Sequence, residues 1–77
     1  MKERVLLLFG QMKKEVLDLH ELFEAGGNDP DERRRVLFAV EQLVAEGLLE
    51  ERGNDFYALT TEGERAAVSL NRNPKEN

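Results

Sequence analysis

The chain has 77 residues, enough for one small domain, and it has no cysteine, which excludes a disulfide framework and a thiolate metal site. Its 16 acidic and 11 basic side chains give a net charge of −5, whereas a dedicated nucleic-acid binder is typically basic. No apolar run is long enough to span a bilayer, so we expect a cytoplasmic protein with no membrane partner.

The first 27 residues carry two conflicting patterns. Apolar residues repeat with alternating steps of four and three from Val5 to Phe23, which is typical of one continuous helix. Asp18 and Glu21, however, have the spacing of a capping box, which starts a new helix. We favour two helices, about Glu3 to Glu15 and Leu19 to Ala25, and keep a single long helix as the alternative.

The next helix is predicted over Pro30 to Glu46. Asp29 can cap it, Pro30 suits the first helical position, and Glu32 has capping-box spacing. Its apolar residues gather on one arc at the helical period, which is the expected core face. These core-facing residues are Val36, Leu37, Val40, Leu43, Val44 and Gly47. The opposite arc holds Arg34, Phe38, Glu41, Gln42 and Ala45.

A β-hairpin and a short helix are predicted to follow. Gly53-Asn54-Asp55 can supply the positive φ angles of a tight loop between strands at Leu48 to Arg52 and Phe56 to Thr60. Thr60 or Thr61 then caps the last helix, and Thr61 has capping-box spacing to Glu64. We expect one domain over residues 1–70, followed by a polar, disordered tail over residues 71–77.

The C-terminal half resembles winged helix-turn-helix regulators of bacteria and archaea, such as the MarR-like and PadR-like families. The resemblance rests on the leucine-rich helix that ends in Glu46-Gly47-Leu48 and on Tyr57-Ala58-Leu59-Thr60-Thr61-Glu62-Gly63 after the charged hairpin. It implies a mainly α fold with a three-helix core, a β-hairpin wing and a short C-terminal helix. It covers about half of the chain and is nearly silent on function, because one fold hosts many functions.

The resemblance also implies a role for each element. The helix that begins at Pro30 would be the recognition helix, which lies in the major groove of duplex DNA. The protein would then be a transcriptional regulator or an accessory factor. The candidate DNA-binding residues are Arg33, Arg34, Arg35, Arg52 and Asn54.

Several residues oppose DNA binding and favour an alternative. Phe38 and Glu41 occupy the helix face that should read bases, and phosphates repel a carboxylate. The segment from Gly26 to Asp29 is longer than the usual tight turn, and the hairpin is rich in acidic residues. The alternative is a protein-interaction module with little or no DNA binding. Its candidate interaction residues are Phe38, Glu41 and Ala45.

The N-terminal region predicts a homodimer. It carries more apolar residues than one face of a short helix needs, with Leu7 lying opposite the stripe of the other apolar residues. The candidate residues of this dimer seam are Val5, Leu7, Phe9, Met12 and Val16. The alternative is that the stripe simply faces the core of its own domain.

Neither catalysis nor metal binding is expected. His20 is the only histidine, and it has no second ligand at a diagnostic spacing, so we expect a surface side chain there. The chain has no cysteine or serine nucleophile motif, and its acidic residues are spread over helix surfaces. We therefore predict no enzyme activity, no cofactor and no metal site.

Overall fold

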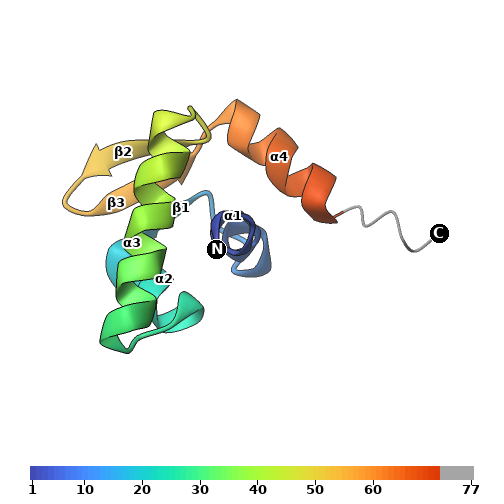
Figure 1. The fold of residues 1–77 in the computed structure, drawn as a ribbon. Coiled ribbons are helices and arrows are strands. Elements are labelled where there is room, and N and C mark those ends of the chain that lie inside the picture. Colours follow the sequence, from blue (N-terminus) through green and yellow to red (C-terminus); the bar gives the residue numbers. More distant parts are fainter. Residues whose placement is uncertain (72–77) are drawn as a thin grey trace.

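A computed structural model describes residues 1–71 of the chain. It is mainly helical, as predicted, with a small antiparallel sheet of three strands (Figure 1). The elements in chain order are α1 (Lys2–Gln11), β1 (Val16–Asp18), α2 (Leu19–Gly26), α3 (Pro30–Ala45), β2 (Leu49–Gly53), β3 (Phe56–Leu59) and α4 (Thr61–Asn71). Asn71 belongs to α4, and the rest of the predicted tail lies outside the described residues.

The N-terminal region contains a strand that the sequence did not predict. The favoured prediction of two helices is confirmed, but α1 ends at Gln11 rather than Glu15, and the single long helix is wrong. Lys13 follows with a positive φ of 56°, which turns the chain. β1 then pairs antiparallel with β3, with Leu17 opposite Tyr57. The stripe of apolar residues therefore runs through a helix, a turn and a strand.

α2 begins with the predicted capping box. The Asp18 carboxylate accepts a hydrogen bond from the Glu21 N–H at 2.8 Å, and the Glu21 carboxylate accepts one from the Asp18 N–H at 3.0 Å. These two bonds satisfy backbone donors that no helical carbonyl reaches. They fix the point at which β1 ends and α2 starts.

The turn between α2 and α3 is shorter than predicted, because α2 includes Gly26 and only residues 27–29 connect the two helices. Gly27 has a φ of 136°, a conformation that side chains disfavour. Asp29 caps α3 by accepting a hydrogen bond from the Glu32 N–H at 2.9 Å. The Glu32 carboxylate pairs with Arg35 rather than returning to Asp29, so this cap is one-sided.

The sheet has the order β1-β3-β2, with β3 in the centre. β2 and β3 form the predicted hairpin, in which Leu49 lies opposite Leu59 and an irregularity separates Glu51 from Gly53. Gly53, Asn54 and Asp55 all have positive φ, as the sequence predicted for this loop.

Thr60 ties the last helix to the rest of the domain. Its hydroxyl accepts a hydrogen bond from the Gly63 N–H at 2.9 Å and donates one to the Gly47 carbonyl at 2.7 Å. Thr60, one of the two predicted caps, thus caps α4, and Thr61 is the first residue of the helix. A Cβ atom on Gly63 would overlap the Leu48 carbonyl oxygen, so α4 closely approaches the segment between α3 and β2.

One hydrophobic core joins the first three helices to the sheet. Its buried members are Val5, Leu6, Leu8, Phe9, Leu17, Leu22, Val36, Ala39, Val40, Leu43, Leu49 and Tyr57. Four of these come from α1, which therefore contributes as much to the core as α3 does. Over residues 1–71, no helix combines the length and the apolar character that crossing a membrane requires.

Candidate functional site

The exposed side of α3 is the most distinctive surface of the domain. α3 packs on α1, α2 and β2 through its apolar side, so its other side faces solvent. Figure 1 looks onto this helix, which crosses in front of the sheet. We call its solvent-facing side the α3 outer surface. It consists of Asp31, Arg34, Arg35, Phe38, Glu41, Gln42 and Ala45.

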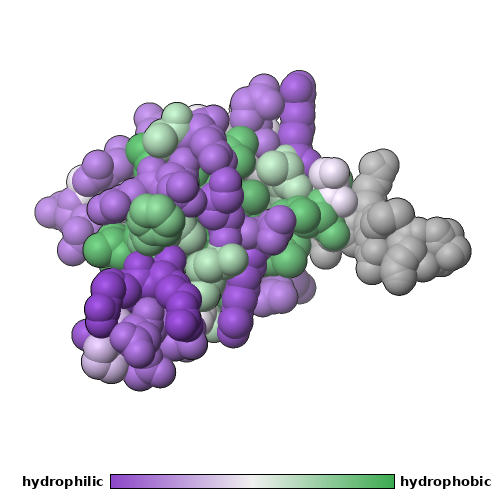
Figure 2. All heavy atoms as spheres, viewed as in Figure 1, coloured by the Kyte–Doolittle hydropathy of each residue, from purple (hydrophilic) through white to green (hydrophobic). Residues whose placement is uncertain are grey.

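Phe38 lies at the centre of the α3 outer surface, with 62% of its area exposed. Such exposure is unusual for an aromatic side chain, because burial of a Phe is worth roughly 1.5–3 kcal/mol. In Figure 2 hydrophobic residues interrupt the hydrophilic surface over the middle of α3, whereas its N-terminal end is hydrophilic. The protein thus presents an apolar centre within a charged helix face.

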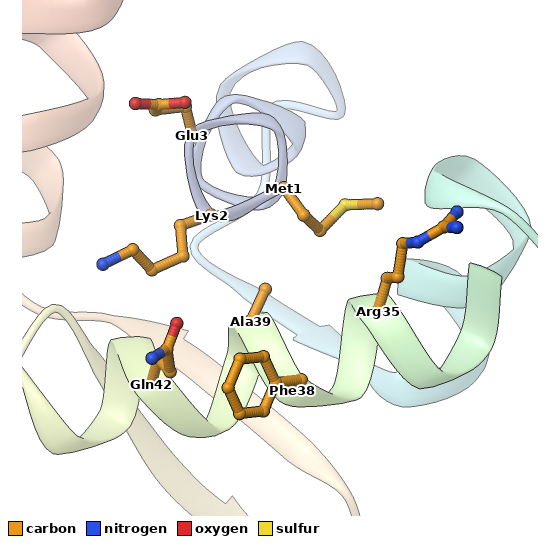
Figure 3. Close-up of a pocket in the computed structure, with 7 residues that line it drawn as sticks. All are labelled: Met1, Lys2, Glu3, Arg35, Phe38, Ala39 and Gln42. Carbon is orange, nitrogen blue, oxygen red and sulfur yellow. The ribbon is translucent and has the colours of Figure 1, made fainter. Parts of the chain in front are cut away.

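A shallow depression of about 320 Å³ lies beside Phe38, between α3 and the start of α1. Ala39 points from α3 toward α1 at its base, and Met1 and Arg35 approach each other at one end (Figure 3). Lys2 and Gln42 lie at the other end. Met1 and Lys2 were not predicted as site residues, because only tertiary packing brings them to α3.

The three arginines at the start of α3 all have local partners. Arg34 pairs with Asp31 at 3.1 Å, and Arg35 pairs with Glu32 at 3.2 Å. The Arg33 Nε donates to an Asn28 side-chain oxygen at 3.0 Å, and its guanidinium lies 5.4 Å from the centre of the Phe23 ring. Each exposed ion pair stabilises by only tenths of a kcal/mol. These pairs therefore partly neutralise the arginines, but the arginines can exchange them for other partners.

The hairpin beside α3 is acidic. Arg52 is paired with Glu50 at 3.2 Å, and Asn54 is exposed in the loop. Burial first, and then the charges of Glu51, Asp55 and Glu41, raise the pKa of the Tyr57 hydroxyl above its usual range. Glu41, Glu51 and Asp55 form what we call the acidic group. Within residues 1–71, none of these three has a basic partner within 4 Å.

The candidate dimer seam does not form one surface. Val5 and Phe9 are buried in the core of their own chain, which corrects their assignment to a seam. Leu7 and Met12 are half-buried, and Val16 is exposed on β1. The heptad spacing assumed a continuous helix, whereas the chain turns after α1 and points these side chains in different directions.

His20 belongs to no group of possible metal ligands in the part of the chain that the structure describes. His20 lies on an exposed surface, where its Nε2 is 3.2 Å from a Glu24 carboxylate oxygen. Across residues 1–71, no three His, Cys, Asp or Glu side chains are placed to hold a metal ion.

The α3 outer surface thus offers an apolar centre, flanked by arginines toward the start of the helix and by the acidic group toward its end, and Val68 and Leu70 on α4 are exposed as well. No family model, curated protein or solved structure matches this chain.

Proposed function

We propose that this protein is a winged helix-turn-helix domain that binds another protein through the α3 outer surface. The observation that carries the proposal is the exposure of Phe38, at 62%, at the centre of that surface and beside a depression. Aromatic side chains near arginines are enriched among the residues that dominate protein interfaces. A partner that covers Phe38 would remove its ring from water, and this burial would contribute a favourable free energy to binding.

The element order supports a winged helix. α2 and α3 are joined by residues 27–29 with a glycine at the first position, which is the kind of short turn found in helix-turn-helix motifs. The hairpin of β2 and β3 follows α3 and would be the wing, and β1 adds a third strand beside it. α3 would then occupy the place of the recognition helix.

The charges favour a protein partner over DNA. Arg33, Arg34 and Arg35 each have an acceptor from their own chain, and a phosphate would have to replace it. In the acidic group, Glu41 belongs to α3 and the other two residues belong to the hairpin, so a duplex that contacts both elements would bring its phosphates toward these carboxylates. The net charge of −5 adds a long-range repulsion from nucleic acid.

DNA binding is the second candidate, because three exposed arginines on the first turns of α3 favour it. Their ion pairs are weak enough to exchange for phosphate contacts. Fluorescence anisotropy with labelled duplexes at about 50 mM salt tests this function directly. We expect no binding. Saturable binding that weakens steeply with salt and disappears when Arg33, Arg34 and Arg35 are all changed to Ala would establish DNA binding and overturn the proposal.

Protein binding is tested with a photo-reactive phenylalanine analogue at position 38 of the full chain, in an extract of the organism that encodes it. The same analogue at Val68, which is 57% exposed on α4, is the matched control. A protein that cross-links from position 38 alone is then purified, and its affinity is measured by calorimetry. We expect Phe38→Glu to weaken that affinity at least about tenfold without unfolding the domain. If wild type and Phe38→Glu bound that protein with equal affinity, the proposal would be refuted.

A further inference from the structure

We propose that the occupant of the α3 outer surface is a second copy of this chain, with the two α3 helices antiparallel about a two-fold axis at Phe38. This inference rests on the proposed function, because it requires that the α3 outer surface binds protein. It names the partner, and it moves the dimer contact from α1, where Val5 and Phe9 are buried, to α3.

The order of residues along α3 makes its outer surface self-complementary. The surface runs from Asp31 to Ala45, and Phe38 is its midpoint. In an antiparallel pair centred there, each residue faces the one equally far from Phe38 on the other side. The two Phe38 rings therefore meet at the axis. Arg35 faces the second copy's Glu41, and Arg34 faces the second copy's Gln42.

The charges select the antiparallel arrangement. The Arg35 side chain is 63% exposed, and its contact with Glu32, at 3.2 Å, is a surface pair that it can leave or share. Glu41 belongs to the acidic group and has no basic partner within 4 Å among residues 1–71. The antiparallel pair thus supplies the cation that Glu41 lacks. A parallel pair would instead place like charges together.

The shape of the domain allows this contact. α3 has 16 residues, which corresponds to a rod of about 24 Å, and it stands in front of the sheet in Figure 1. The depression beside Phe38, lined by Met1 and Ala39, leaves room for the partner's ring. A contact along one helix falls in the class of small interfaces, below about 1,200 Å², so we expect a weak and reversible dimer.

This dimer would also cover the face that a DNA-binding winged helix needs. Arg34 and Arg35 would be occupied by the second copy, and Phe38 would be buried. Self-association and DNA binding through α3 therefore exclude each other in this arrangement.

Sedimentation equilibrium of the full chain tests the inference with a charge-swap cycle at Arg35 and Glu41. We expect wild type to dimerise with a dissociation constant of about 100 µM, typical of a small interface. R35E and E41R should each weaken dimerisation about tenfold or more, because each places like charges across the axis. The double variant R35E/E41R should recover most of the wild-type affinity.

Two controls accompany this cycle. R65E makes the same charge change at an exposed arginine on α4, and it should leave dimerisation unchanged. Phe38→Glu should abolish dimerisation without relying on the ion pair, and circular dichroism should show that every variant is folded.

A wild-type chain that stays monomeric at about 1 mM, or a dimer that the charge swaps do not affect, would overturn the inference. Cross-linking from position 38 distinguishes failure of this inference from failure of the proposed function. If the chain is monomeric yet position 38 cross-links to a different protein, self-docking is wrong and protein docking stands. If position 38 cross-links only to a second copy but the charge-swap cycle shows no recovery, the antiparallel arrangement is wrong.

Discussion

Phe38 and Phe9 are the same residue type in opposite surroundings. Phe9 is 1% exposed within the core, whereas Phe38 is 62% exposed on α3. Removing a buried ring leaves a cavity, which typically costs about 3–5 kcal/mol, and a change on the surface usually alters stability by less than about 0.5 kcal/mol. This contrast separates a core residue from a binding residue.

We therefore predict that Phe9→Ala lowers the free energy of unfolding by about 3 kcal/mol or more, and that Phe38→Ala changes it by less than about 0.5 kcal/mol. Urea unfolding of both variants at a low protein concentration, where any dimer has dissociated, measures the two values. A comparable loss in Phe38→Ala would show that this ring belongs to the fold and would remove the basis of the binding surface.

The Glu21 carboxylate, at the start of α2, makes the stability of the fold depend on pH. The pKa of its carboxyl lies below its ordinary value of 4.5, first because Lys14 Nζ donates a hydrogen bond to it at 2.8 Å and then because the Asp18 N–H donates another. A carboxyl with a lowered folded pKa stabilises the fold fully above its ordinary pKa, and this stabilisation is lost as the pH falls through the folded value.

Glu21→Gln keeps the capping geometry but removes the charge, so it should lower the melting temperature at about pH 7. The difference from wild type should shrink as the pH falls below the ordinary pKa of 4.5. Thermal melts across this pH range measure both effects. Glu3→Gln, at an exposed residue of the first turn of α1, serves as the control. A difference that does not change with pH would contradict the assigned role of the carboxylate.

At the scale of elements, two helical glycines are placed to give opposite outcomes. A Cβ atom on Gly10, near the end of α1, would meet nothing within 4 Å. A Cβ atom on Gly63, in the first turn of α4, would overlap the Leu48 carbonyl oxygen. The only effect of Gly10 is therefore a larger loss of conformational entropy on folding, whereas Gly63 allows α4 to approach the segment between α3 and β2.

We predict that Gly10→Ala raises the free energy of unfolding by about 0.5–1 kcal/mol and that Gly63→Ala lowers it by about 1–3 kcal/mol. Guanidinium unfolding followed by circular dichroism measures the free energy of unfolding of both variants and of wild type. If Gly63→Ala were as stable as wild type, the close approach of α4 would be wrong.

Elements with local start and stop signals were predictable from the sequence, and those that depend on distant pairing were not. α3 begins at the predicted Pro30 and ends one residue before the predicted Glu46, because Asp29 and Gly47 mark its limits. β1 was missed because it is three residues long and exists through its pairing with β3, about 40 residues later. The heptad stripe indicated one continuous helix, which is wrong, because spacing alone does not show where a helix ends.

The candidate site was predictable only in part. Amphipathicity correctly placed Phe38 on the side of α3 away from the core. The sequence left open whether another element covers that ring, and it did not show that Met1 lines the depression beside it. Both depend on how α1 crosses α3, which is a property of tertiary packing.

At the scale of the whole molecule, the distribution of charge matters more than its sum. Arg34 and Arg35 lie toward the start of α3, and the acidic group lies toward its end and on the hairpin. A uniform polyanion such as DNA meets attraction at one end of α3 and repulsion at the other. A partner with the reverse order of charges meets attraction at both ends, and a second copy in the antiparallel direction has that order.

The most direct test is a set of ¹H–¹⁵N correlation spectra of the full chain, recorded from about 20 µM to about 1 mM protein and then with duplex DNA at about 50 mM salt. We predict that amide signals of the α3 outer surface, centred on Phe38, shift as the protein concentration rises and that DNA causes no shift. Spectra that do not depend on protein concentration, together with DNA-induced shifts on the first turns of α3 and on the hairpin, would contradict the account.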